Sequence, residues 1–247
     1  MLKKLVLGLI LVFSVSAVSF AQPTFDFSKM AASEKEKLSP IGDWLASGSS
    51  AMMWTTASAP TAFGFGVGVY VSGGSIPDIS IPNIEVPKFA PNNLGIKVTA
   101  GTMGVEVAAR YMPLVLGLKS MGFGAKYEFT KLLPLPPGTP LSLAGYFDYN
   151  KINFEADDNA FEFKNTSFGV LASGDLFVVT LYGRLGFETG SGSLSWKYNI
   201  NNVKYPDGID LSSNGMRAAV GIKLLGINLE AGTRAGTYFG AGYGFSF

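Results

Sequence analysis

Met121-Gly-Phe-Gly-Ala-Lys-Tyr-Glu-Phe-Thr130 is the stretch that decides the fold class. Every second residue from Met121 to Phe129 is apolar, and the residues between them are glycine, lysine or glutamate. A strand places successive side chains on opposite faces, so one face here is apolar and the other has only charged residues or glycine. Strands of transmembrane β-barrels have this pattern over about ten residues, with one face toward lipid and the other toward the lumen.

The same alternation recurs along the rest of the chain. Nine further segments follow it: 61–72, 94–101, 103–112, 141–150, 165–173, 177–188, 216–224, 227–234 and 239–247. Together they predict an all-β protein, a closed antiparallel up-and-down transmembrane β-barrel of about ten strands, with eight or twelve as alternatives. A soluble β-sandwich also alternates. Aromatic residues at the strand ends, with a charge or glycine on the opposite face, favour the barrel.

The connections predict which end of the barrel faces which compartment. Bacterial barrels normally keep both chain ends in the periplasm and have short turns on that side. If the first strand runs outward, the inner turns are short or Pro-rich: 101–103, 131–139, 174–175 and 225–226. The outer connections are then mostly longer: 73–92, 113–118, 151–163, 189–211 and 235–237. Within the fourth of these, Ser193 to Ile200 alternatively extend two strands into an external hairpin. Proline recurs in the first of these, which favours an extended loop.

Residues 1–21 have the layout of a secretory signal peptide. Lys3 and Lys4 precede an apolar run, and small residues stand at the expected cleavage after Ala21. An uncleaved anchor is the alternative, but the run is shorter than the roughly 18 residues that a span needs. We therefore expect three parts in a protein of the bacterial outer membrane. They are a cleaved Sec-type signal peptide at 1–21, a periplasmic or plug segment at 22–58, and the barrel at 59–247.

Composition excludes several classes of protein. The chain has no cysteine, so it holds no disulfide, no thiolate metal site and no lipid on an N-terminal cysteine. It has no histidine, which excludes the Ser/His and Asp/His arrangements of barrel enzymes. Without Lys3 and Lys4, the 19 basic residues become 17 against 18 acidic ones, a balance that gives no footprint for nucleic acid. We expect no enzymatic activity, no cofactor and no metal ion.

Charged side chains of mixed sign lie on the face that the alternation places in the lumen. They are Lys97, Glu106, Arg110, Lys126, Glu128, Asp148, Arg184, Glu188, Arg217, Lys223, Glu230 and Arg234. Two interpretations stay open. In a barrel of eight to ten strands the side chains nearly fill the interior, and the charges then form a closed, salt-bridged core. Alternatively they line a narrow, weakly selective pore.

Glycines form the lumen-facing rows of the first and last strands, which become neighbours when the barrel closes. The rows are Gly64, Gly66, Gly68 and Gly240, Gly242, Gly244. Such glycines relieve crowding in a tight barrel. Alternatively, the seam accommodates a plug made of residues 40–58, which include two tryptophans. Just before the plug, Ser33 and Glu34 predict a short helix through Leu38 that Pro40 interrupts.

The last strand carries a sorting signal. Its outward row ends in Tyr243, Phe245 and Phe247, which resembles the C-terminal pattern that the barrel-assembly machinery reads. The expected partners are therefore that machinery and outer-membrane lipid. The sequence leaves the oligomeric state open.

Four stretches carry a resemblance to a known family. They are Leu94–Gly101, Val105–Pro113, Met121–Phe129 and Gly145–Tyr149, and the pair Arg-Tyr-Met-Pro and Gly-Phe-Gly-Ala-Lys-Tyr is the most specific part. Their order resembles that of a family of small bacterial outer-membrane β-barrels whose function is unknown. The resemblance covers most of the mature chain. It implies fold and location, and it implies no activity.

Two functional hypotheses follow. In the first, the protein is porin-like and lets small solutes pass through a narrow lumen of mixed charge. In the second, the lumen is closed, and the barrel is structural or binds a ligand at the surface, where Trp196, Tyr198 and Tyr205 gather in one outer connection. Single-channel conductance in planar bilayers distinguishes the two.

Overall fold

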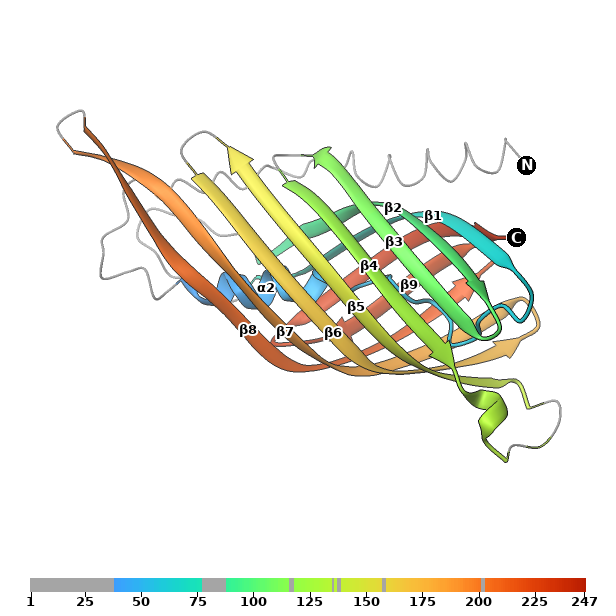
Figure 1. The fold of residues 1–247 in the computed structure, drawn as a ribbon. Helices are drawn as coiled ribbons and strands as arrows, with labels where there is room; N and C mark the ends of the chain where they lie inside the picture. The colour runs from blue at the N-terminus through green and yellow to red at the C-terminus, as the bar shows by residue number, and fades with distance from the viewer. Residues whose placement is uncertain are drawn as a thin grey trace.

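A computed structural model describes residues 38–76, 88–115, 118–134, 136, 139–156, 159–200 and 203–247. The signal peptide and most of the Pro-rich connection lie outside these residues. Ten antiparallel strands close into one barrel, with neighbours in sequence paired and β1 paired with β10 (Figure 1). The strands are β1 (Gly64–Ser75), β2 (Phe89–Thr102), β3 (Val105–Val115), β4 (Leu118–Glu128), β5 (Leu141–Ala156), β6 (Asn159–Leu176), β7 (Val179–Ile200), β8 (Val203–Leu224), β9 (Ile227–Thr233) and β10 (Thr237–Ser246). The predicted fold class and strand number are confirmed.

Tight turns lie at the end of the barrel where β1 begins and β10 ends, which we call the inner end. Met103 and Gly104 join β2 to β3 with φ of 52° and 81°, and Leu225 and Gly226 join β8 to β9 with φ of 48° and 91°. Two positive φ angles give a type I′ turn, whose twist matches the strands, and glycine adopts one without strain. Phe177, predicted to open a strand, instead lies in the β6–β7 turn with φ of 56°.

Strands β5 to β8 extend beyond the others at the opposite, outer end (Figure 1). β7 and β8 have 22 residues each, whereas β9 has 7 and β10 has 10. Most of the residues predicted as outer connections at 151–163 and 189–211 instead lie in paired strands, β5 with β6 and β7 with β8. The alternative prediction, an external hairpin that includes Ser193–Ile200, is confirmed, because these residues pair with Val203–Asp210. The side chains at 154–159 and 196–207, including the three predicted surface aromatics, lie outside the described part of the chain.

The apolar face of these strands changes side along their length. On β7, Leu185 and Phe187 face outward near the inner end, but Ser193 faces outward farther along. The inward side chains change from Arg184 to Leu194. The other three strands behave alike, with these apolar residues turned inward: Ile152, Phe163 and Leu211. We call residues 151–164 and 189–214 the projecting part, and the barrel on the inner side of them the inner barrel.

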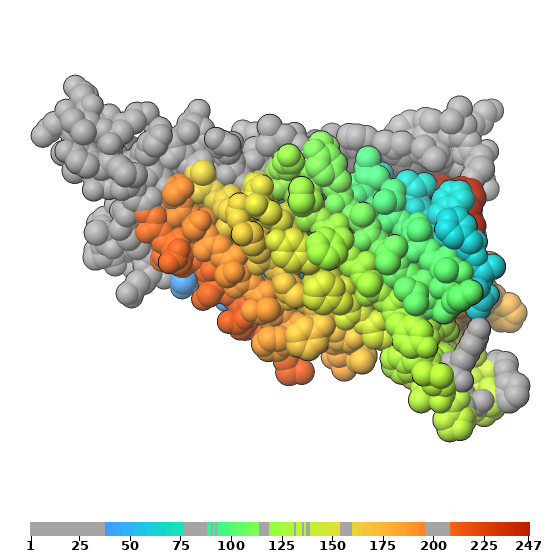
Figure 2. Space-filling model, viewed as in Figure 1, coloured from blue at the N-terminus to red at the C-terminus, as the bar shows by residue number. Residues whose placement is uncertain are grey.

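A helix lies inside the barrel. α2 (Pro40–Ser49) has eight buried residues. In the view of Figure 2, where this helix is blue, only a small part of it is visible beside the strands. The helix predicted from Ser33 to Leu38 lies almost wholly outside the described residues, and Pro40, predicted to interrupt it, opens α2. It stands in the first turn, where a backbone N–H would have no helical partner. A short 3₁₀ turn, η3 (Thr130–Leu132), follows β4. Within the described residues, no helix has the length and hydropathy needed to cross a bilayer.

Candidate functional site: the occupied lumen

Residues 38–59, which we call the internal segment, run through the lumen from the outer end to the inner end. At the outer end Leu38 belongs to a buried cluster with Leu194 of the projecting part. At the inner end the next residue, Pro60, accepts a hydrogen bond from the N–H of Gly104 in the β2–β3 turn (3.0 Å). The segment then turns back into β1.

The structure places the twelve charged residues of the lumen prediction on inward positions. Eight are buried: Arg110, Lys126, Asp148, Arg184, Glu188, Arg217, Glu230 and Arg234. Four are half-buried: Lys97, Glu106, Glu128 and Lys223. Arg234 lies just past the end of β9, in the turn that leads to β10. Their role as the lining of a pore stays a prediction.

Four of these cations hold the backbone of the internal segment. Residues 50–58 follow the end of α2 and lie in no helix or strand, so their buried carbonyls need partners from the wall. The first of them, Ser50, is the C-cap of α2, at the negative end of the helix dipole, where a positive side chain is favoured. The donors and acceptors are Arg184 Nη1 to Ser50 O (2.8 Å), Arg110 Nη1 to Ala51 O (3.0 Å), Lys97 Nζ to Met52 O and Met53 O (3.0 and 3.1 Å), and Lys126 Nζ to Thr56 O and Ser58 O (2.7 and 2.8 Å).

Two carboxylates of the wall accept hydrogen bonds from the same segment. The indole Nε1 of Trp54 donates to Asp148 Oδ1 (2.6 Å), and both side chains are buried. The N–H of Ala59 donates to Glu128 Oε2 (2.7 Å) at the inner end. Each contact satisfies a polar group that would otherwise be buried without a partner, which stabilises one register of the segment in the lumen.

Asp43 on α2 is a site residue that the sequence analysis missed. Arg234 Nη1 lies 3.1 Å from Asp43 Oδ1, and Ser213 Oγ of β8 donates to the same carboxylate oxygen. Arg234 Nε also lies 3.0 Å from Glu188 Oε2. Asp43 escapes a search for alternation because it lies ahead of the strands. It therefore ties the helix to the wall through a contact that no strand pattern signals.

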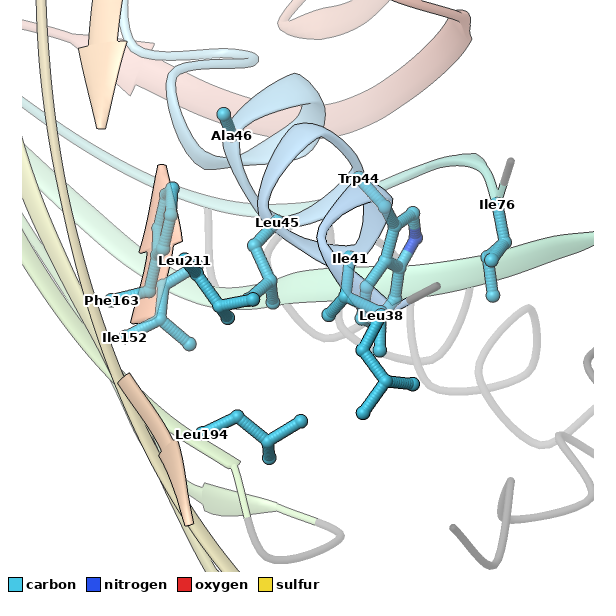
Figure 3. Close-up of a cluster of buried hydrophobic side chains, with 10 residues drawn as sticks. All are labelled: Leu38, Ile41, Trp44, Leu45, Ala46, Ile76, Ile152, Phe163, Leu194 and Leu211. Carbon is cyan, nitrogen blue, oxygen red and sulfur yellow. The ribbon is translucent and has the colours of Figure 1, made fainter. Parts of the chain in front are cut away.

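The outer half of the internal segment packs on apolar side chains. Figure 3 shows Leu45 pointing toward Leu211, Phe163 and Ile152 of the wall. The full cluster contains Leu38, Ile41, Trp44, Leu45, Ala46, Ile76, Ile152, Phe163, Leu194 and Leu211. The cluster lies inside the projecting part, so α2 is the core of the region where the strands turn their apolar face inward.

The glycine rows at the seam show both of the behaviours that the sequence left open. A Cβ built on Gly240 would come within 2.6 Å of Met52 Cγ, and one on Gly242 within 3.1 Å of Met52 Cε. On β1, a Cβ on Gly68 would instead meet the backbone of β10, 2.9 Å from Tyr243 O. Gly240 and Gly242 therefore make room for the internal segment, whereas Gly68 and Gly244 permit close approach of the two strands.

Buried ion pairs connect the inward charges of β7, β8 and β9. Arg184 Nη2 and Glu230 Oε1 are 2.6 Å apart, as are Arg217 Nη1 and Glu188 Oε1. Tyr238 links them, since its hydroxyl accepts from Arg217 Nε (2.9 Å) and donates to Glu230 Oε1 (3.1 Å). The sequence analysis missed this inward tyrosine. Its parity with the next inward glycine of β10 was the available signal.

Two cavities lie in the inner half of the lumen. One of about 60 Å³ is lined by residues 52–56 and by glycines of β1 and β10, among them Gly68 and Gly244. The other, of about 310 Å³, opens at the inner end, and its lining includes Glu106, Thr180 and Lys223. Among the described residues, no three acidic side chains come together as a metal site. The arrangement is suited to holding the internal segment in place.

The sequence from residue 94 to residue 247 matches the profile of a family of unknown function, DUF6588, over more than half of the chain. The chain belongs to this family. The resemblance inferred from the sequence is thereby confirmed. The DUF6588 match begins within β2, so the internal segment and β1 lie outside it. No curated protein matches the chain.

The solved structures that match the chain include two outer-membrane proteins. Ail, the attachment invasion locus protein of Yersinia pestis, is 15% identical, with 76% of this chain and 99% of that one covered and a TM-score of 0.36. A triple-mutant porin of Rhodopseudomonas blastica is 7% identical, with 74% and 99% covered and a TM-score of 0.17. Likeness at this level says nothing about a function shared with this DUF6588 chain.

Proposed function

We propose that this protein is an integral outer-membrane β-barrel whose lumen is sealed by its own residues 38–59. In this proposal it acts as a closed structural or surface-binding protein and has no catalytic role. The observation that carries the proposal is the set of hydrogen bonds that four inward cations donate to backbone carbonyls of the internal segment. A buried carbonyl and a buried cation are both unfavourable alone, so each stabilises the other in the closed state.

The outer surface supports a location in a bilayer. Large apolar side chains of the inner barrel are exposed on its outside: Val107 (51%), Phe123 (55%), Leu185 (56%), Val220 (67%) and Phe239 (53%). A water-soluble monomer rarely exposes an apolar surface that continues around it in this way. Phe65 and Phe247 stack at the inner end, with ring centroids 5.1 Å apart, as expected of an interfacial aromatic girdle.

The projecting part supports a role at the surface. A tilted strand needs about 9–11 residues to cross the hydrocarbon core. β7 and β8 have 22 residues each, so about half of each lies beyond the bilayer in this proposal. Their outward side chains there are polar, as a sheet that faces water requires. This sheet is the part of the molecule that an external ligand would reach first.

Passive passage of small solutes is the second candidate function. The charges around the two inner cavities, including Glu106 and Lys223, are compatible with ion or solute entry from the inner end. Passage across the membrane then requires residues 50–59 to leave their partners on the wall. That requirement makes an open channel the less favoured of the two functions.

Conductance in planar bilayers tests the seal. We expect no reproducible single-channel steps from the mature chain and clear steps from a variant that lacks residues 23–58, once circular dichroism shows that the variant forms a barrel. Conductance steps from the mature chain as large as those of the variant would contradict the proposal. A deletion variant that folds as a barrel and shows no conductance would contradict it too.

A milder variant keeps the chain intact in case the deletion does not fold. Changing Lys97→Met and Lys126→Met together removes four hydrogen bonds to carbonyls at 52–58 and leaves the segment in place. We expect intermittent steps from this variant. The matched control is Lys119→Met, an exposed lysine of β4, which should stay silent. Equal behaviour of the two variants would show that the cations do not hold the seal.

A further inference from the structure

The internal segment has a fixed direction through the barrel. Its first described residue, Leu38, is buried among side chains of the projecting part at the outer end. Its last residue, Ala59, is bound to Glu128 at the inner end, and Thr61 accepts a hydrogen bond from Met103 N in the β2–β3 turn (3.2 Å). The chain therefore passes from the outer end to the inner end before it enters β1.

We infer that the internal segment passes through the barrel with its N-terminal end, at Leu38 and Ser39, on the outer side of the membrane and its C-terminal end, before Thr61, on the periplasmic side. The inference rests on the proposed placement in the outer membrane, with the tight turns in the periplasm.

Contacts along the whole segment show that it runs in this one direction. Asp43 forms an ion pair with Arg234 in the outer turn between β9 and β10. Deeper in the lumen, Trp54 donates a hydrogen bond to Asp148. A segment inserted from the periplasm and returning there would have to reverse inside the lumen. The 22 residues from Leu38 to Ala59 make a single pass, with their contacts ordered from the outer end to the inner end.

The direction also constrains assembly. A secreted chain reaches the barrel-assembly machinery from the periplasm, so the internal segment has to cross the membrane while the barrel forms. β1 follows the segment almost directly and pairs with β10 over nine positions at the closing seam. The exposed Ser39 then lies next to the projecting part at the cell surface.

Single cysteines test the inference cleanly, because the chain has none of its own. Ser39 is exposed at the outer end of the internal segment and Thr61 is exposed past its inner end. Asp210, exposed on the projecting part of β8, is a control for the outer side. Intact cells that express Ser39→Cys, Thr61→Cys or Asp210→Cys are treated with a membrane-impermeant maleimide, before and after the outer membrane is permeabilised.

We expect Ser39→Cys and Asp210→Cys to be labelled on intact cells, and Thr61→Cys only after permeabilisation. Labelling of Asp210→Cys without Ser39→Cys would overturn the inference and leave the barrel's orientation intact. Labelling of Thr61→Cys alone would show the opposite insertion and overturn it through the orientation. Channel steps from a mature chain whose Ser39→Cys variant is labelled would contradict the seal, and the direction of the segment would still stand.

Discussion

The inner barrel and the projecting part use the same strands in opposite ways. On β7 of the inner barrel Leu185 points out and Arg184 points in, whereas on its projecting part Ser193 points out and Leu194 points in. In the proposed placement the medium around the wall explains the difference, since lipid favours apolar side chains outside and water favours them inside. The alternation along one strand then marks where it leaves the bilayer.

The internal segment is matched to this change. Its helical half, α2, contributes apolar side chains such as Leu45 to the core of the projecting part. Its non-helical half offers backbone carbonyls to the charged wall of the inner barrel, for example Ser50 O to Arg184. One half is therefore held by apolar packing, which is not directional, and the other by directional polar bonds that fix its register. The predictions that follow test this division.

The largest effect is expected from Arg184→Met in the inner barrel. The substitution leaves Glu230 buried without its closest cation and Ser50 O without its donor. Breaking a fully buried pair by removing one partner lowers the free energy of unfolding by about 3–5 kcal/mol. Urea titration of the refolded barrel in detergent measures the loss.

A second substitution separates the pair from the packing around it. In Arg184→Met combined with Glu230→Leu, no carboxylate is left unpaired at this place, so much of the lost stability should return. If the double variant is as unstable as the single one, the loss arises from the shape of the arginine side chain, and the polar account of the inner barrel fails.

Leu45→Ala in α2 is expected to have the next largest effect. Leu45 is fully buried in the cluster of Figure 3, and truncating a buried leucine lowers the free energy of unfolding by about 2–5 kcal/mol through lost burial and the cavity that remains. Urea titration against Leu185→Ala, a lipid-facing truncation of the same size, is the matched comparison. Equal losses would show that α2 does not form a core.

Exchanging the outward faces tests the boundary between the two parts. Leu185→Arg puts a charge on the lipid side of β7, which destabilises a barrel by about 2–4 kcal/mol near the bilayer midplane. Ser193→Arg makes a comparable change on the same face of the same strand, where we expect little effect because the side chain faces water. Unfolding in lipid vesicles measures both. A similar penalty at both positions would move the boundary outward, past Ser193.

The same change of face explains how far the sequence could be interpreted. Inner-barrel strands such as 121–130 were predictable because a fixed rule, apolar outward and charged inward, holds along them. At 151–163 and 189–211 the sequence predicted outer connections, with only Ser193–Ile200 as an alternative hairpin, because the rule reverses there and Ile152 and Leu194 fall on the face that is polar nearer the inner end. The strands keep alternating apolar and polar residues through the reversal. Which of the two sets points into the barrel depends on whether lipid or water surrounds the strand.

Other parts of the site carry no periodic signal. The inward charges followed from strand parity, but their partners did not, because the backbone carbonyls that four of them bind can come from any residue. The ion pair of Asp43 with Arg234 joins positions 191 apart in the chain, and only the completed barrel brings them together. The course of the internal segment depends on such contacts, so no local pattern predicted its direction.

The smallest effect is expected from Asp43→Asn, which tests whether a charge at the outer end matters as much as one in the inner barrel. Asp43 is 35% exposed, and its partner Arg234 keeps a second carboxylate in Glu188. Ion pairs that reach solvent contribute about 1 kcal/mol or less, so global unfolding should change little. Amide hydrogen exchange in α2 should nevertheless become faster, since the helix loses its charged tie to the β9–β10 turn, while exchange in β7 stays the same. A loss as large as that of Arg184→Met would mean that a polar tie anchors the outer half as well, and the division between apolar and polar anchoring would have to be abandoned.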